Sequence, residues 1–218
     1  AAKIGIKTFV LSFSRVRSFN IFLTALTAFE LWKIVKKYNI DLIHTDSPRE
    51  TFYAGLVGKF SGTRVVFHAR VDDSFLWLDR VIYKLVDRII AVSMAVAVRF
   101  KDDIKNKVNV VYNGVELDIF KPSDKYTRDK HYFTIGYFGR IDRRKDISIL
   151  INAVKKFDNN VRLIIKGAGD PEYLEELKKI SDNTKITFEP YKKDIMEDIA
   201  KVDIVALASS KGEGLPRI

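Results

Sequence analysis

The segment Gly139–Lys145 places a guanidinium, Arg140, and an ammonium, Lys145, five residues apart between an apolar run and a helical pattern. Glycine lets the backbone approach a ligand closely, and the start of a helix presents N–H groups. The two side chains add a forked and a compact positive charge. This combination suits a diphosphate. A solvated basic turn would have the same composition, so both interpretations stay open at this point.

Two further side chains have chemistry that would suit a sugar or a phosphate. His68 directly follows the apolar run Val65–Phe67, where an imidazole could hydrogen-bond a hydroxyl or phosphate oxygen, or be a satisfied buried histidine. Glu213 stands between Gly212 and Gly214, and its carboxylate could accept hydrogen bonds from two neighbouring hydroxyls. Acids flanked by glycine are also common in turns.

Short β-branched runs alternate with longer helical patterns along the whole chain, which is typical of βαβ units with buried parallel strands. The sequence therefore predicts an α/β fold with doubly wound sheets. The expected strands are Ile4–Leu11, Asp41–His44, Arg64–His68, Arg88–Val92, Val108–Tyr112, Phe133–Phe138, Val161–Lys166, Lys185–Phe188 and Ile204–Leu207. The expected helices are Phe19–Tyr38, Arg49–Phe60, Phe75–Val86, Ser93–Ile104, Ile147–Phe157, Pro171–Ile180 and Asp194–Ala200.

Open parallel sheets bind ligands beyond the carboxyl ends of their strands, so residues that follow the expected strands are the candidates for a site. They are His44, Asp46, His68, Arg70, Ser93, Asn113, Gly139, Arg140, Lys145, Gly167, Gly169 and Glu213. Among them, His44 has Thr45 and Asp46 beside it, which favours a structural polar network for this residue.

A polar stretch with a proline and almost nothing to bury, residues 122–131, is the best candidate for a linker. It divides the sequence into a first domain, residues 1–121, and a second domain, residues 132–218.

Composition excludes several classes of protein. The 218 residues contain no cysteine, which removes disulfides and thiolate chemistry and fits a cytoplasmic protein. No metal-ligand, P-loop or serine-hydrolase motif is present, so no metal site is predicted.

The most apolar stretch, Ile21–Val35, is too short to cross a bilayer. The net charge of +10 is concentrated in the first half, with 19 Lys and Arg against 12 Asp and Glu up to Lys121.

Taken in order, several motifs resemble the retaining glycosyltransferases of family 4, which have the GT-B fold of two Rossmann-like domains. The motifs are Ile40–Thr45, Val65–Arg70, Ile89–Ser93, Val111–Glu116 with Phe120–Pro122, Gly139–Arg140 with Lys145, Lys166–Gly169 and Ser209–Pro216. The resemblance implies that the second domain binds a nucleotide-diphosphate-sugar donor, the first domain faces a saccharide or lipid-linked acceptor, and no cofactor or metal takes part.

The resemblance also assigns roles to individual residues. Arg140 and Lys145 would stabilise the departing diphosphate, and His68 would contact the transferred sugar. Glu213 would contact that sugar or assist the charge on its ring. The donor-binding set of residues would be Gly139, Arg140, Lys145, Gly167, Gly169 and Glu213.

Three features depart from the pattern of the family. Asp146 follows Lys145 where glycine is usual, which suggests a tighter or more acidic loop. The second glutamate of the family would fall at position 221, and its opening strand has no counterpart before Lys3. We therefore expect a fragment that lacks both ends and is inactive alone.

Two other functions remain as alternatives. Another GT-B enzyme, such as a nucleotide-sugar epimerase or a phosphorylase, would share the scaffold. A non-enzymatic basic domain that binds nucleic acid is disfavoured, because the aromatic residues fall within expected strands and helices instead of alternating with Lys and Arg on one stripe. The positive charge of the first domain also fits peripheral contact with an anionic membrane at its inner face.

Overall fold

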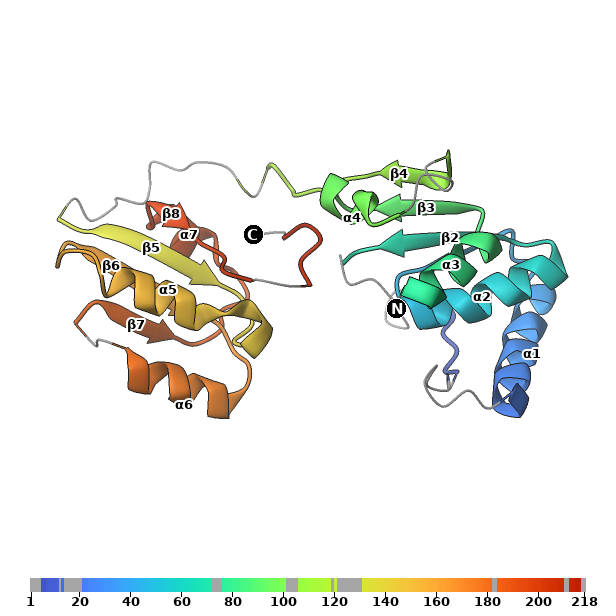
Figure 1. The fold of residues 1–218 in the computed structure, drawn as a ribbon, viewed down its shortest axis with the longest axis horizontal. Helices are drawn as coiled ribbons and strands as arrows, with labels where there is room; N and C mark the ends of the chain where they lie inside the picture. Colours follow the sequence, from blue (N-terminus) through green and yellow to red (C-terminus); the bar gives the residue numbers. More distant parts are fainter. Residues whose placement is uncertain are drawn as a thin grey trace. The chain divides into compact units, whose positions relative to one another are not determined.

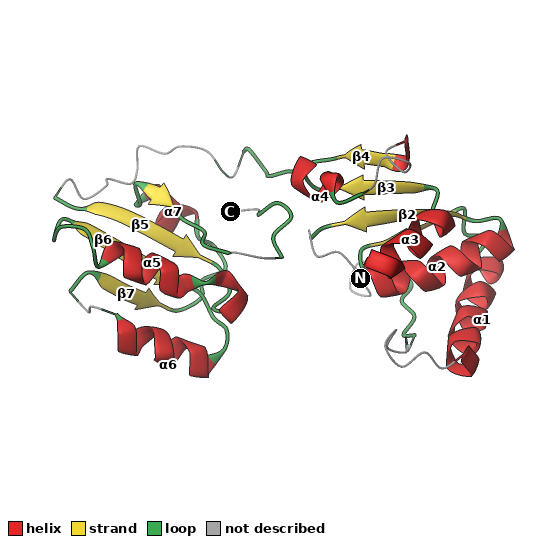
Figure 2. Cartoon of the chain, viewed as in Figure 1, coloured by secondary structure: helices red, strands yellow, loops and turns green. Residues whose placement is uncertain are grey.

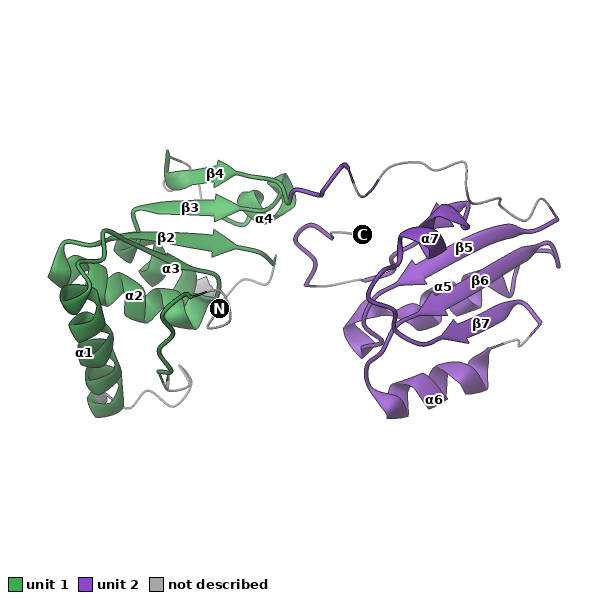
Figure 3. Cartoon of the chain, turned by 180° about the vertical axis from the view of Figure 1, so that it is seen from behind, with its two compact units in different colours: residues 1–113 green, residues 114–218 purple. Residues whose placement is uncertain are grey.

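A computed structural model describes residues 5–11, 13, 21–71, 76–100, 106–118, 120, 131–181, 184–209 and 212–216. The chain forms two compact units, residues 1–113 (unit 1) and 114–218 (unit 2) (Figure 3). Each unit combines one parallel sheet with helices (Figures 1 and 2). The predicted linker, residues 122–131, lies outside the described residues except for its last position.

Unit 1 contains four parallel strands in the order β1-β2-β3-β4. Their bounds are Leu42–Thr45, Arg64–Ala69, Arg88–Ala91 and Val108–Val110. The helices are α1 (Ile21–Lys37), α2 (Pro48–Ser61), α3 (Leu76–Leu85) and α4 (Met94–Val98). Helix α2 packs against α1, α3, β1 and β2, and so forms the centre of the helical layer (Figure 1).

In β2 and β3 of unit 1, buried apolar residues alternate with less buried ones. Along β2, Val65, Phe67 and Ala69 are buried beneath α2, while the residues between them are less buried. Ser93 caps α4 as expected, because its hydroxyl accepts a hydrogen bond from the N–H of Val96 at 3.2 Å.

Unit 2 contains four parallel strands in the order β7-β6-β5-β8. Their bounds are Ile186–Glu189, Val161–Lys166, Phe133–Phe138 and Ile204–Val205. The short 3-10 helix η3 spans Arg143–Lys145, and the α-helices are α5 (Ile147–Val154), α6 (Pro171–Ile180) and α7 (Met196–Ala200). Because consecutive strands are joined by right-handed crossovers, α5 and α6 cover one face of the sheet and α7 the other (Figures 1 and 3).

The order of the strands in unit 2 reverses at β5. The chain moves outward from β5 through β6 to β7, and then returns to place β8 on the other side of β5. Such a reversal opens a crevice beyond the carboxyl ends of the two strands that flank it. A ligand site is therefore expected where β5 and β8 end.

The strand predicted at Ile4–Leu11 is wrong for the part that the structure describes. Residues 5–11 form no strand, and Val10 is 98% exposed. Apolar character alone does not make a strand, because the backbone must also find a neighbour for its hydrogen bonds. The other expected strands form, although β4 and β8 each end two residues early, before the predicted Tyr112 and Leu207.

Candidate functional site

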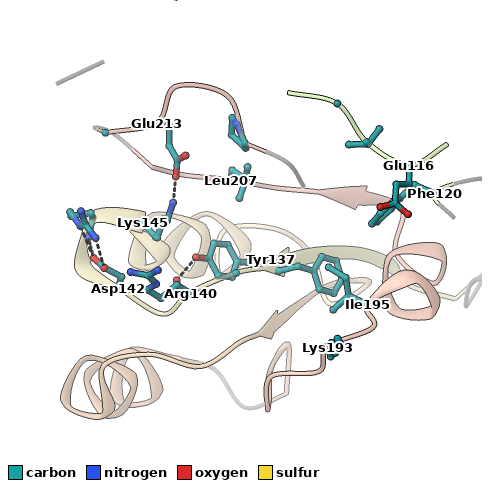
Figure 4. A pocket seen from close by; sticks show the side chains of 17 residues that line it. Glu116, Phe120, Tyr137, Arg140, Asp142, Lys145, Lys193, Ile195, Leu207 and Glu213 are labelled. Atoms are coloured by element: carbon teal, nitrogen blue, oxygen red, sulfur yellow. Dashed lines mark hydrogen bonds and ion pairs between the residues drawn. The ribbon is translucent and has the colours of Figure 1, made fainter. Parts of the chain in front are cut away.

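A cavity of about 720 Å³ opens where β5 and β8 end. We call it the first cavity; its lining includes Gly139, Arg140, Lys145 and Glu213. Figure 4 shows Arg140, Lys145 and Glu213 on one side of this cavity, with Lys193 and Ile195 on another. The loops after two separate strands thus bring together four of the residues selected from the sequence.

The backbone on either side of Arg140 is fixed from two directions. The hydroxyl of Tyr137 donates a hydrogen bond to the carbonyl oxygen of Arg140 at 2.7 Å. The N–H of Gly139 donates to the carbonyl of Lys166 at 3.1 Å, and the N–H of Ile141 donates to the carbonyl of Ala168 at 3.0 Å. The segment after β5 therefore continues the parallel pairing with the segment after β6, which holds Arg140 at the rim.

This pairing explains two of the predicted glycines. A Cβ atom at Gly167 would lie 1.8 Å from the carbonyl oxygen of Gly139, and one at Gly169 would lie 1.9 Å from that of Ile141. No side chain fits such distances, so both glycines are needed for the close approach of two backbones. Their predicted contact with a ligand stays a prediction.

The basic loop contains four cations, and two arginines are engaged by carboxylates. Arg143 binds Glu176 through two N–H groups at 2.5 and 2.8 Å. Arg144 binds Asp142, and its hydrogen bonds hold the pKa of that carboxyl well below its usual range. Among the residues that the structure describes, Arg140 has no hydrogen bond or ion pair through its guanidinium. This side chain is therefore available to an anion.

Lys145 and Glu213 contact each other in the wall of the first cavity. The ammonium of Lys145 forms an ion pair with Oε1 of Glu213, which also accepts a hydrogen bond from the hydroxyl of Ser209 at 3.1 Å. Burial, and then the charges of Arg144 and Arg140, hold the pKa of Lys145 below its ordinary value. An anion that entered here would meet the guanidinium of Arg140, which no described residue pairs, and the ammonium of Lys145, which is shared with a carboxylate.

The turn that carries Lys145 into α5 has a left-handed residue. Asp146 adopts φ 47° and ψ 39°, a conformation that favours glycine and costs most other residues about 1 kcal/mol. The geometry of a glycine turn is thus kept although the residue is an acid. The expectation of a tighter or more acidic loop stays a prediction.

A second cavity of about 400 Å³ includes Arg140, Lys166, Ala168 and Tyr191 in its lining. Lys193 and Ile195 line both cavities. The residues after β7 were not selected from the sequence. The signal was present, because Tyr191 and Lys193 are the second and fourth residues after the end of β7 and obey the same rule that selected Arg140.

His68 lies near the carboxyl end of β2 in unit 1. Its ring stacks on that of His44 with centroids 5.4 Å apart. Both ring nitrogens are buried and have no hydrogen-bond partner among the described residues. Burial, and then the charges of Arg70 and His44, hold the pKa of His68 below its ordinary value of 6.5, although Asp46 acts in the opposite direction. The imidazole is therefore neutral at pH 7 and can donate one hydrogen bond and accept another.

Within the described ranges, no three His, Cys, Asp or Glu side chains gather in a way that could hold a metal ion. No helix in this part of the chain has both the length and the apolar character that crossing a membrane requires.

Comparison with known proteins supports a single assignment for both units. Residues 7–119 match the family model described as Glycosyltransferase Family 4, and residues 118–218 match the model described as Glycosyl transferases group 1. One curated relative, described as an uncharacterized glycosyltransferase of Methanocaldococcus jannaschii, is 33% identical over 81 residues. That match covers 37% of this chain and 21% of the relative.

Solved structures share the fold. The Anabaena protein HepE in complex with UDP matches with a TM-score of 0.76 and 21% identity, over 88% of this chain and 59% of that one. A glycosyltransferase from Rickettsia africae matches with a TM-score of 0.73 and 22% identity, over 94% of this chain and 60% of that one. The chain thus spans about 60% of these proteins. The likeness confirms the predicted GT-B type of α/β fold, and the family models show that the chain belongs to glycosyltransferase family 4.

Proposed function

We propose that the protein transfers a sugar from a nucleoside-diphosphate-sugar donor to an acceptor hydroxyl. The observation that carries this proposal is the first cavity, where Arg140 and Lys145 lie together beyond the ends of β5 and β8. The solved relatives support the same class of donor, since one of them was determined with UDP and with UDP-glucose.

The proposed chemistry needs positive charge at one oxygen. When the bond between the anomeric carbon and the diphosphate breaks, its electron pair stays on the phosphate oxygen as negative charge. A new bond then joins the anomeric carbon to the acceptor oxygen, and the proton of the acceptor hydroxyl passes to the departing diphosphate or to water. Arg140 can bind the departing diphosphate as a fork, and Lys145 adds a compact charge beside it.

Glu213 and His68 complete the proposed set. The diphosphate would compete with Glu213 for the ammonium of Lys145, which frees the carboxylate to accept hydrogen bonds from sugar hydroxyls. His68 would contact the transferred sugar through its neutral ring. Gly139, Gly167 and Gly169 would let the backbone approach the donor.

The finer features of the reaction belong to the same proposal. We infer retention of configuration at the anomeric carbon, and a saccharide or lipid-linked acceptor on the side of residues 1–121. Residues 132–218 would hold the donor, with neither metal nor other cofactor. The protein would act in the cytoplasm.

Ligand-induced stabilisation of the full-length protein tests the donor site. UDP, GDP and ADP and their glucose conjugates are compared by thermal unfolding, each at several concentrations. The matching diphosphate is expected to stabilise the protein by about 2.7 kcal/mol at 100 times its Kd. If none of these compounds shifts the midpoint, a donor site of this kind is excluded.

A product assay separates transfer from the alternatives. With labelled donor and candidate acceptors, transfer yields a new glycoside and a free nucleoside diphosphate. An epimerase instead yields an isomeric donor, and a phosphorylase yields a sugar phosphate. Either of these products would replace the proposed activity on the same scaffold.

Peripheral contact with an anionic membrane is a second proposal, and the surface of α1 favours it. Phe22, Leu26 and Phe29 are about half to three-quarters exposed on this helix, which ends in Lys36 and Lys37. Apolar side chains beside lysines suit the boundary of an anionic bilayer. We expect Phe22→Ser with Phe29→Ser to reduce co-flotation of the full-length protein with vesicles of anionic lipid. Equal flotation of both proteins would exclude α1 as the contact.

A further inference from the structure

A lysine lies buried where the apolar core of unit 2 meets the cavities. Leu163 and Ile165 of β6 are fully buried, and the side chain of Lys166, the last residue of this strand, is only 9% exposed. An ammonium removed from water costs free energy unless carboxylates compensate it. The presence of a lysine at this position therefore needs a physical reason.

Two carboxylates compensate this charge. The Nζ atom of Lys166 lies 2.8 Å from Oε2 of Glu189 and 2.7 Å from Oδ1 of Asp198. Burial lowers the pKa of Lys166, but the hydrogen bonds that it donates to Asp198 and Glu189 outweigh this effect and raise the pKa above its ordinary value. The lysine stays charged, and each of its two bonds reaches a different element.

The two carboxylates stand on either side of one loop. Glu189 is the last residue of β7, Asp198 lies within α7, and residues 190–195 connect these elements. Lys166, on the neighbouring strand, thus holds the chain both before and after this loop.

The 190–195 loop forms part of the wall of both cavities. Lys193 and Ile195 line the first cavity and the second, and Tyr191 lines the second. Lys166 itself lies in the lining of the second cavity, next to Ala168. A shift of the loop would therefore change the shape of both cavities at once.

We propose that Lys166 is a positioning residue, which acts through Glu189 and Asp198 to fix the 190–195 loop in the conformation that binds the nucleoside diphosphate part of the donor. The restraint of the loop is a property of the protein without ligand. Its effect on the donor rests on the proposed function, so the two parts are measured separately.

The test uses Glu189→Gln and Asp198→Asn in the full-length protein. Each variant leaves one charged carboxylate for Lys166. Glu189→Gln weakens the side-chain contact before the loop, where β7 also pairs with β6, and Asp198→Asn weakens the contact after it, together with the 3.8 Å ion pair from Lys192 to Asp198. Glu175→Gln is the matched control, because it removes an ion pair of the same length, 2.8 Å from Lys178, on the exposed surface of α6.

Hydrogen–deuterium exchange without ligand measures the restraint. The amide of Ile199, which donates to the carbonyl of Ile195 at the end of the loop at 2.9 Å, and the amides of Lys201 and Val202 are expected to exchange about tenfold faster in both variants, with no change in the control or in β6. Unchanged exchange in these amides would overturn the proposal, whatever the substrate of the protein is.

Steady-state kinetics measures the effect on the donor. We expect the KM for the donor to rise about tenfold while kcat stays within about twofold, because the loop positions the nucleoside part and not the reacting atoms. Faster exchange with an unchanged KM would overturn the role in donor binding. Sugar transfer that is absent even in the unsubstituted protein would instead overturn the proposed function, and the exchange result would still decide whether Lys166 restrains the loop.

Discussion

Replacing Arg140 with Met is expected to lower kcat/KM for the donor about 100- to 1,000-fold. The reason is that Arg140 is the guanidinium of the basic loop with no carboxylate partner among the described residues. Loss of one preorganised group aimed at developing negative charge typically has an effect of this size. Methionine keeps much of the length of the side chain and removes only its charge and its donors. The measurement is the initial rate of sugar transfer at several donor concentrations.

Arg143→Met is the matched control for this prediction. Arg143 lies three residues away in the same loop, but its guanidinium is bound to Glu176 and stacks on the ring of Tyr173. We expect kcat/KM to change less than about threefold in this variant. Full activity of Arg140→Met would contradict the catalytic proposal and leave only the fold assignment.

Replacing Gly169 with Ala is expected to destabilise unit 2 by about 3 kcal/mol or more. The new Cβ atom would lie 1.9 Å from the carbonyl oxygen of Ile141, and backbone cannot move aside as a flexible side chain can. Separation of the two segments would break the hydrogen bond from Ile141 to Ala168 and the one from Asp170 to Ile141, each 3.0 Å long. Binding of the donor should be lost with them.

Tryptophan fluorescence and circular dichroism together can show that Gly169→Ala destabilises unit 2 and not unit 1. Both tryptophans, Trp32 and Trp77, belong to unit 1, so their fluorescence reports mainly on that unit. We expect urea unfolding followed by circular dichroism to show an earlier transition in Gly169→Ala, while the fluorescence midpoint changes little. Gly114→Ala, whose Cβ would meet nothing within 4 Å, is the control. Coincident, unshifted transitions would show that the close approach is not needed.

Much of the fold could be predicted because local signals and the tertiary structure agree. The bounds of β5, β6 and α6 match the prediction, since apolar runs end at polar residues and the Asp170–Pro171 pair starts α6. The strand predicted at Ile4–Leu11 was wrong because a strand also needs a neighbouring strand to pair with. No pattern within these eight residues shows whether such a neighbour exists. The sequence likewise gave no sign of where the order of the strands reverses.

The sequence predicts which residues belong to the site better than it predicts which of them contact each other. Arg140, Lys145 and Glu213 were selected because each follows a strand, and the structure places them on one cavity. The ion pair between Lys145 and Glu213 joins residues 68 positions apart, which no local spacing indicates. Lys166 was recognised only as the end of a strand, since its two carboxylates come from elements that fold beside it later in the chain.

The left-handed backbone at Asp146 shows what shapes the turn beneath Lys145. An L-residue there bears steric strain that glycine would not, so the turn is imposed by its surroundings. Three backbone hydrogen bonds supply that frame: Lys145 to Asp142, Asp146 to Arg143, and Ile149 to Asp146, at 2.9, 3.2 and 2.9 Å. The orientation of the ammonium is thus set by a backbone turn, and its left-handed residue restricts position 146 to glycine and the few residues, such as Asp and Asn, that tolerate this conformation.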